Sequence, residues 1–162
     1  MECKSFPPLI GLDPRILILG SMPGVTSLSE NQYYAHPQNL FWRIIEENFG
    51  CAFSRPYHQR TQCLLKNHIA LWDVVGSCQR SGSLDSAIQN AITNPIEQLI
   101  EKHTTIHTIV FNGQTAAKVF YKNFPNWDHT QLITAPSTSP ANASIQRAEK
   151  FAQWKKALHL SF

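Results

Sequence analysis

Short runs of apolar residues, each ended by glycine or a polar residue, recur along the chain. They cover residues 16–19, 69–75 and 106–111, and a shorter run covers 132–134. A run that is apolar at every position is typical of a strand buried on both faces, as in a parallel sheet, because a strand with one face in water alternates apolar and polar residues. The pattern therefore predicts four buried strands.

Helical spacing of apolar residues appears between the predicted strands. Residues 39–49 place apolar side chains three and four positions apart, and Gly50 then supplies a stop. Further segments at 57–67, 114–123 and 144–158 are also predicted to be helices. The last of these should carry its basic residues on the exposed side, namely Arg147, Lys150, Lys155 and Lys156.

One more helix is predicted from its start signals. Asn94 is placed to cap it, and Pro95 suits its first turn. Glu97 stands where a capping box needs a carboxylate, and the helix should run to about Lys102. Strands and helices then alternate, and we interpret 76–83 as a loop within one domain. This order predicts an α/β fold in which a mainly parallel sheet has helices on both faces.

Composition agrees with a single domain over residues 1–162. With 43% hydrophobic residues, the chain can build an ordinary core without help from metals or disulfides. No stretch approaches the roughly 18 apolar residues of a membrane span, and the N-terminus lacks the apolar core of a signal peptide. We therefore expect a cytoplasmic protein without a membrane partner. The net charge of +3 permits a polyanionic partner without demanding one.

The cysteines and histidines show no spacing that is typical of a ligand site. No CxxC pair occurs, which argues against a zinc site and a cysteine-held iron–sulfur cluster, and the seven histidines include no HExxH. The four cysteines are therefore expected to be reduced thiols. They are Cys3, Cys51, Cys63 and Cys78.

Common catalytic motifs are also missing. The chain has no GxxxxGK[ST] phosphate loop, and GSMPG at 20–24 is not the GxGxxG of dinucleotide-binding proteins. No GxSxG elbow surrounds a serine. These absences argue against a nucleotide cofactor and an acyl-transfer enzyme, and we expect neither a cofactor nor a metal.

Polar loops follow three of the predicted strands. Because the carboxyl ends of parallel strands meet at one edge, and ligands of open α/β sheets bind beyond that edge, these loops should form one site. They are 20–39, 112–114 and 136–142. Asp73, near the end of the second strand, either enters this site or caps a turn.

Single residues in these loops allow two interpretations each. Asn112 has the acceptor and donor needed to read the edge of a nucleobase, or it is a turn residue before Gly113. Tyr33 and Tyr34 either stack on a base or cover the core. Asn39 takes part in the site or caps the following helix.

Taken together, the loops resemble a known family. GSMPG is followed by YYAHPQNLFW, with VFNG near the middle and APSTSPAN near the end. In this order the motifs resemble the uracil-DNA glycosylase superfamily over nearly the whole chain. They are most similar to its hypoxanthine-DNA glycosylase branch, also called deoxyinosine glycosylase or family 6. The AHPxNxFW part is also similar to the mismatch-specific uracil/thymine-DNA glycosylases.

The resemblance implies a three-layer α/β/α sandwich with a four-stranded, mainly parallel sheet. It also implies a monofunctional DNA glycosylase of base-excision repair, which flips a deaminated base out of damaged DNA and hydrolyses its N-glycosidic bond. We expect a monomer. The alternatives are mismatch-directed uracil or thymine excision, a non-catalytic DNA-binding relative, and a nucleotide-binding α/β protein unrelated to DNA.

The motifs also imply roles for particular residues. In the mismatch-specific relatives, the third residue of a GxNPG turn is an asparagine that positions the attacking water, whereas here it is Met22. The resemblance therefore moves the catalytic amide to Asn39 and shifts the expected substrate from uracil toward hypoxanthine. It implies that Tyr34 stacks on the flipped base and that Asn112 reads it. Ser21 and Met22 would line the pocket through their backbones.

The PSTSPAN segment resembles the family's loop that pinches the phosphate backbone and fills the space left by the extruded nucleotide. Ala135 stands where classical uracil glycosylases have a histidine, so a histidine acting on the leaving base is not expected. The phosphate candidates are Ser137, Thr138 and Ser139. The wedge candidates are Pro140, Ala141 and Asn142.

Overall fold

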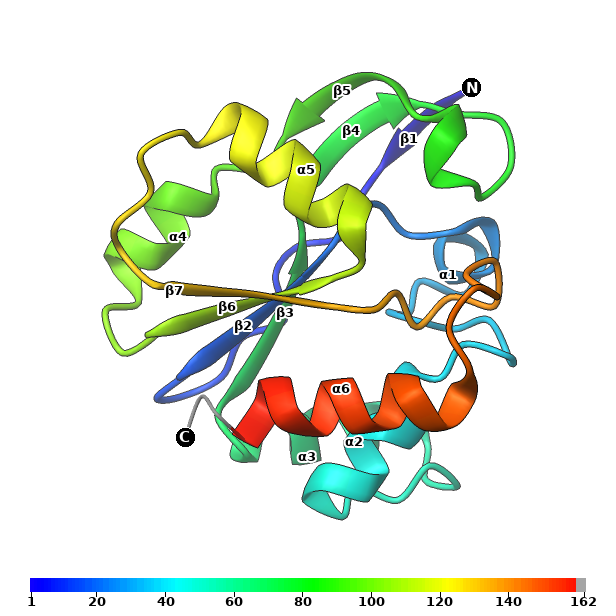
Figure 1. The fold of residues 1–162 in the computed structure, drawn as a ribbon, viewed down its shortest axis with the longest axis vertical. Coiled ribbons are helices and arrows are strands. Elements are labelled where there is room, and N and C mark those ends of the chain that lie inside the picture. Colours follow the sequence, from blue (N-terminus) through cyan, green and yellow to red (C-terminus); the bar gives the residue numbers. More distant parts are fainter. Residues whose placement is uncertain (160–162) are drawn as a thin grey trace.

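A computed structural model describes residues 1–159 of the chain, so the last three positions of the predicted domain lie outside it. A central four-stranded sheet lies between two layers of helices (Figure 1). This arrangement confirms the predicted three-layer α/β/α sandwich. Among the described residues, none of the helices has the length and apolar character that crossing a bilayer requires.

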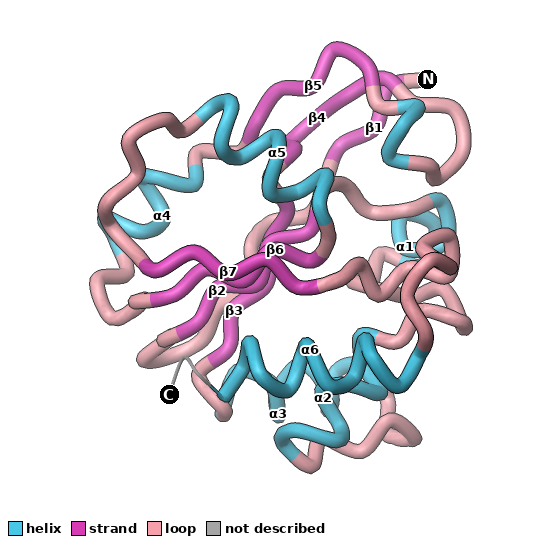
Figure 2. Tube along the Cα trace, in the orientation of Figure 1, coloured by secondary structure: helices cyan, strands magenta, loops and turns pink. Residues whose placement is uncertain are grey.

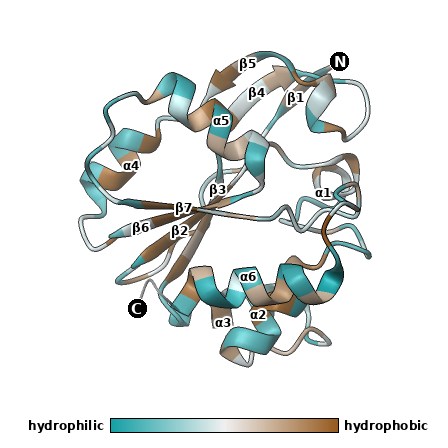
Figure 3. Ribbon diagram, viewed as in Figure 1, coloured by the Kyte–Doolittle hydropathy of each residue, from teal (hydrophilic) through white to brown (hydrophobic). Residues whose placement is uncertain are grey.

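The central sheet contains the four predicted strands, in the order β3-β2-β6-β7, and all of its pairs are parallel. Its strands are β2 (Ile16–Gly20), β3 (Ile69–Asp73), β6 (Thr108–Asn112) and β7 (Gln131–Ala135). Every residue of β2, β3 and β6 is buried, as their continuous apolar runs predict. The strands of this sheet appear as hydrophobic segments in Figure 3.

Each face of the sheet packs against its own group of helices (Figure 1). Alternation along β2 explains this division, because Ile16 and Ile18 join one buried cluster and Leu17 and Leu19 join the other. The first cluster includes residues of α2 (Phe41–Phe49), α3 (Tyr57–Lys66) and α6 (Arg147–His159). The second includes residues of α4 (Ile96–Lys102) and α5 (Gln114–Asn123).

A second, antiparallel sheet of three strands lies beside the N-terminus (Figure 2). Its strands are β1 (Glu2–Lys4), β4 (Val75–Gln79) and β5 (Gln89–Thr93), in the order β1-β4-β5. The interpretation of 76–83 as a loop is therefore wrong for Gly76 to Gln79. These short segments lack a clear apolar pattern and become strands through pairing with distant residues.

Two shorter elements were also not predicted. α1 (Val25–Glu30) follows the turn after β2, and a 3-10 helix, η1 (Asp85–Ala87), lies between β4 and β5.

Two expectations about the helices are wrong. Asn94 does not cap α4, because its Nδ2 donates to the Asp73 backbone oxygen at 2.8 Å and to Ser5 Oγ at 3.1 Å, and Pro95 takes the cap position. Lys150 of α6 is only 4% exposed, and its Nζ donates to the Ser139 backbone oxygen at 3.3 Å. A long side chain can bury its stem in this way when its charged end meets a carbonyl group.

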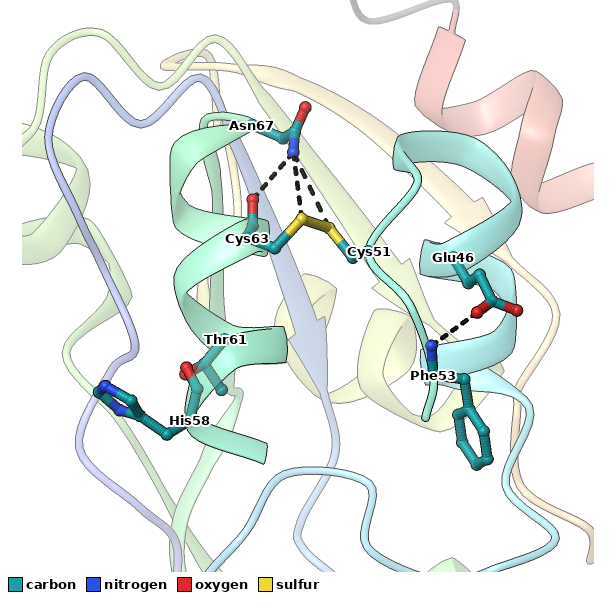
Figure 4. Close-up of a disulfide and its surroundings, with 7 residues drawn as sticks. All are labelled: Glu46, Cys51, Phe53, His58, Thr61, Cys63 and Asn67. Carbon is teal, nitrogen blue, oxygen red and sulfur yellow. Dashed lines mark hydrogen bonds between the residues drawn. A yellow bond between two sulfur atoms is a disulfide. The ribbon is translucent and has the colours of Figure 1, made fainter. Parts of the chain in front are cut away.

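A disulfide joins Cys51 and Cys63 (Figure 4), which contradicts the expectation that all four cysteines are reduced. The segment after α2 passes beside α3, so the two residues have a Cα–Cα distance of 5.7 Å. Asn67 at the end of α3 donates to the Cys63 backbone oxygen at 2.8 Å. The remaining cysteines, Cys3 and Cys78, are free thiols. Only tertiary packing reveals this pair, since its spacing is not a motif.

Replacing both Cys51 and Cys63 by serine should lower the free energy of unfolding by about 3 kcal/mol, because the unfolded chain then loses a cross-link across a short loop. Denaturant unfolding without reductant measures the effect. The free thiol Cys3 provides the control, and Cys3→Ser should change stability by less than about 0.5 kcal/mol. A reductant that leaves wild-type stability unchanged would contradict the prediction.

Candidate active site

A cavity of about 870 Å³ opens at the carboxyl ends of the central strands. It lies where ligands of open α/β sheets bind. Every site residue predicted from the sequence lines it, as the convergence of the strand-end loops required. These residues are Ser21, Met22, Tyr34, Asn39, Asn112, Ser137, Thr138, Ser139, Pro140, Ala141 and Asn142.

Gly20, the last residue of β2, allows two polar side chains to approach each other at the cavity. A Cβ on this residue would lie 2.6 Å from Asp73 Oδ1 and 3.1 Å from Tyr34 Oη. Both contacts are too short for a side chain of any size to fit without movement. Glycine at position 20 therefore leaves the space that the Asp73 carboxyl group and the Tyr34 hydroxyl occupy.

Asp73 belongs to the site, which resolves the alternative that the sequence left open. It pairs in register with Gly20, lines the cavity and is 3% exposed. Neither oxygen of its carboxyl group has a hydrogen-bond partner among the described residues. Burial, and then the nearby charge of Asp85, raises the pKa of Asp73 to about 7, although Arg80 opposes the shift.

Tyr34 packs its ring against the core and turns its hydroxyl toward Asp73. The ring stacks on Phe41 with centroids 4.1 Å apart and an interplanar angle of 24°. Its backbone has φ +55°, the left-handed region that few residues other than glycine adopt. Burial, and then the Asp73 charge, raises the pKa of Tyr34, so its buried hydroxyl keeps its proton. Phe41 covers one ring face, and stacking of the other face on a base stays a prediction.

Asn39 is not the cap of α2, which is Leu40, but its side chain bonds the start of the helix and lines the cavity. Its Oδ1 accepts a hydrogen bond from the Phe41 backbone N–H at 2.9 Å, which satisfies a free amide in the first turn of α2. Its Nδ2 has no partner among residues 1–159, and the side chain lines the cavity. The oxygen therefore holds the carboxamide in place, and the amide donor stays available for chemistry.

Asn112 binds the cavity loop directly. Its Oδ1 accepts the Thr138 N–H at 2.9 Å, and its Nδ2 donates to Thr138 Oγ1 at 3.0 Å. These two bonds leave one amide proton for another acceptor. Reading of a base by Asn112 stays a prediction, and the observed contacts anchor the loop.

Thr138 connects three parts of the site. Besides its two bonds with Asn112, its backbone oxygen accepts the Leu40 N–H at 3.1 Å, next to Asn39. Because Thr138 is only 1% exposed and its hydroxyl oxygen faces Asn112, it is poorly placed to contact a phosphate. Its position instead fixes the loop.

The same loop is exposed at its tip and is held at its base by a hydrogen bond from Trp154. Ser137 Oγ accepts the Ser139 N–H at 3.2 Å, and Ser139 Oγ accepts the Ala141 N–H at 3.2 Å. Each hydroxyl keeps its own proton to donate outward. Pro140 and Ala141 are exposed at the tip, while Trp154 Nε1 holds the loop base through the Pro136 carbonyl at 2.8 Å. Asn142 Nδ2 lies 3.4 Å from the Ser137 backbone oxygen.

The side chains of Ser21 and Met22 do not present new catalytic groups to the cavity. Met22 is 7% exposed and packs against Val75 and Cys78. Ser21 Oγ donates to Asp85 Oδ1 at 2.7 Å. This agrees with the expectation that these residues shape the pocket.

One wall of the cavity could not be predicted from the sequence. The segment from Arg80 to Ser86 folds against the turn after β2, where Arg80 Nη2 donates to the Pro23 carbonyl and Ser83 Oγ accepts the Val25 N–H at 2.8 Å. Arg80 is 3% exposed, and its Nε and Nη1 have no partner among the described residues. The sequence offers no signal for this contact, because glycine and serine in RSGS indicate only a loop.

Asp73→Asn should become more stable relative to the wild type as pH rises from about 4 to about 7. The folded protein keeps the Asp73 proton up to a pKa of about 7, whereas the unfolded chain releases it near 3.8, so ionisation destabilises only the wild-type fold in this window. The difference should grow by about 4 kcal/mol at most. Urea unfolding at a series of pH values measures it.

An exposed carboxyl group supplies the control for this comparison. Asp128→Asn should shift stability by a small amount that does not grow between pH 4 and pH 7. A constant difference between Asp73→Asn and the wild type over the same range would show that the Asp73 pKa is not raised.

Comparisons with known proteins identify the family of this chain. Residues 7–159 match the sequence model of the family described as the uracil DNA glycosylase superfamily. A hypoxanthine DNA glycosylase of Methanosarcina barkeri is 36% identical over 119 residues, which cover 73% of this chain and 75% of the relative. One of Methanosarcina acetivorans is 31% identical over 153 residues, which cover 94% of this chain and 95% of the relative.

A solved structure is also similar over nearly the whole chain. The solution NMR structure of a Methanosarcina acetivorans protein, described as a candidate uracil DNA glycosylase, has a TM-score of 0.86 and 30% identity. The similarity covers 99% of each chain. From the family match, the similar sequences and the shared fold, we conclude that the chain belongs to the uracil DNA glycosylase superfamily and is a DNA glycosylase.

Proposed function

We propose that this protein is a DNA-deoxyinosine glycosylase, which removes hypoxanthine from DNA. The observation that carries the proposal is that Met22 and Asn39 line the same cavity. Met22 puts a buried thioether at the third position of the turn, where it cannot orient a water molecule. Asn39 has a fixed carboxamide whose Nδ2 is not engaged by the protein. The names of the similar Methanosarcina proteins support the same substrate.

The reaction is hydrolysis of the bond between C1′ of the deoxyribose and N9 of the base. The bond electrons leave with the base, the water oxygen bonds to C1′, and a water proton is released to balance the charge. Positive charge develops on the sugar and negative charge on the base, so fixed donors around the base stabilise the transition state. Asn39 would act in this step by holding the water or the leaving base.

The exposed loop tip supports the handling of DNA. Ser137 and Ser139 keep hydroxyl protons for phosphate oxygens, because their oxygens already accept backbone N–H groups. Pro140 and Ala141 are exposed and apolar, as a wedge between base pairs needs to be. Asn142 completes this tip, and the flipped nucleotide would enter the cavity below it.

A panel of duplex oligonucleotides tests the substrate. Each duplex carries a single deoxyinosine, deoxyuridine, deoxyxanthosine or thymidine, and alkaline cleavage of the abasic product measures excision. We expect cleavage at deoxyinosine at the lowest enzyme concentration. Preferred cleavage of a G·U or G·T pair would instead favour the mismatch-directed reaction, to which the AHPQNLFW segment is also similar.

Asn39→Asp should separate catalysis from the hydrogen bond that Asn39 makes to the start of α2. The variant keeps the oxygen that accepts the Phe41 N–H but loses the amide donor, so excision of hypoxanthine should fall about 100-fold or more with little change in stability. Asn39→Ala should lose the same activity and also about 1 kcal/mol of stability. Single-turnover excision and thermal unfolding measure the two effects.

The neighbouring amide provides a matched control. Gln38 is exposed and does not line the cavity, so Gln38→Ala should keep the wild-type rate. If Asn39→Asp excised hypoxanthine as fast as Gln38→Ala, the assignment of Asn39 would be wrong.

A further inference from the structure

Three arginines of α2, α3 and the segment between these helices lie together around the ring of Phe53. The guanidinium carbon of Arg43 lies 4.3 Å from the centre of that ring, and the guanidinium carbon of Arg60 lies 5.7 Å from it. Arg60 Nε also donates to the Arg55 backbone oxygen at 3.0 Å. We call Arg43, Arg55 and Arg60 the arginine patch.

Among residues 1–159, no carboxylate forms an ion pair with the arginine patch. Glu46 follows Arg43 in α2, but its Oε2 accepts the Phe53 N–H at 2.6 Å (Figure 4). Burial lowers the pKa of Arg60, although Tyr57 opposes the shift. Cations that are held close together repel each other, so the patch favours an anionic partner.

The arginine patch is held in position by the protein itself. Arg60 contacts two more rings, with its guanidinium carbon 5.0 Å from the centre of Trp42 and 5.6 Å from that of Tyr57. The segment 51–56, which carries Phe53, is tied to α3 by the disulfide (Figure 4). Side chains that are already fixed lose less conformational entropy when a ligand binds, which favours affinity.

The arginine patch also lies next to the cavity. Tyr57 Oη accepts the Tyr33 N–H at 3.0 Å, and Tyr33 lines the cavity. Arg43 lies in the first turn of α2, and Asn39 lines the cavity just before this helix. The backbone of a duplex that is seated at the cavity can therefore continue over the patch.

Guanidinium groups match the oxygens of a phosphate. Each presents five N–H donors in a planar fork, which suits two phosphate oxygens at once. The Arg43 side chain makes no hydrogen bond among the described residues, and that of Arg60 uses only its Nε. The patch therefore keeps most of its donors for a ligand with several acceptor oxygens.

We propose that the arginine patch binds the phosphate backbone of DNA beside the flipped nucleotide, and so extends the DNA contact beyond the loop at 136–142. This inference goes beyond the proposed function, because it requires a DNA glycosylase but not a particular excised base. Phosphate contacts position a duplex without reading its sequence. The patch therefore binds undamaged and damaged duplexes alike.

The salt dependence of binding tests the arginine patch. Fluorescence anisotropy measures the affinity for an undamaged, labelled duplex as NaCl rises from about 50 mM to about 200 mM. Arg43→Gln should reduce the slope of log K against log salt concentration by about 0.9, and should weaken binding about three- to tenfold at the lowest salt, because one phosphate contact is lost. Arg43→Gln combined with Arg55→Gln should change the slope about twice as much. Both positions are exposed, so these variants should fold, and thermal unfolding checks this.

Arg43→Lys separates charge from packing. Lysine still neutralises a phosphate as a point charge, so the variant should keep the wild-type slope. A purely structural role of the Arg43 guanidinium group predicts the same loss of affinity in Arg43→Lys and Arg43→Gln, and that result would overturn the proposal.

Arg15 supplies the matched control. It is exposed and directly precedes β2, at the edge of the sheet opposite the cavity. Arg15→Gln should therefore keep the affinity and the slope of the wild type. Equal slopes for the wild type and the double variant would overturn the patch, and so would a change in Arg15→Gln as large as that in Arg43→Gln.

The outcomes also separate the arginine patch from the proposed function, because the duplex used for binding carries no lesion. If the wild type does not excise hypoxanthine from a deoxyinosine duplex while the slope still depends on Arg43, the proposed function fails and the patch stands. If the wild type excises hypoxanthine while the slopes stay equal, the patch fails and the proposed function stands.

Discussion

Two hydrogen bonds between the Asn112 carboxamide and Thr138 hold the rest of the site in place. They bind the loop after β7 to the end of β6, and the Thr138 carbonyl then accepts the Leu40 N–H at the start of α2. The loop after β7 and the start of α2, which Asn39 precedes, therefore share one buried anchor. Because buried polar groups need partners, this anchor also fixes the loop geometry.

Polar groups at the cavity fall into two classes that follow from their partners. Asn112, Thr138 and the oxygen of Asn39 are satisfied within the protein and position the backbone. Among the described residues, Asp73 Oδ2 and the Nε and Nη1 of Arg80 are buried without a hydrogen-bond partner. Such unpaired groups destabilise the fold, and the Asp73 carboxyl group lies at the cavity. A site commonly retains groups of this kind because the ligand completes them.

The local chemistry of the sequence predicted the central fold and the position of the cavity. Runs such as Ile16–Leu19 gave the buried strands, and the spacing of Phe41, Ile44 and Ile45 gave α2. Patterns of this kind depend on neighbours along the chain, and they need no knowledge of distant partners. The convergence of strand-end loops then followed from the geometry of a parallel sheet.

The sequence by itself determined the layers of the fold and the edge of the sheet at which the cavity lies. Its motifs also carried a family resemblance, which indicated the residues that line the cavity. Only the tertiary structure decided that Cys51 meets Cys63, that Val75–Gln79 pairs as a strand, and that Lys150 is buried. It also decided that Asp73 enters the site beside Gly20. These features depend on residues that are far apart along the chain, and nothing in their own spacing shows which partner each one meets.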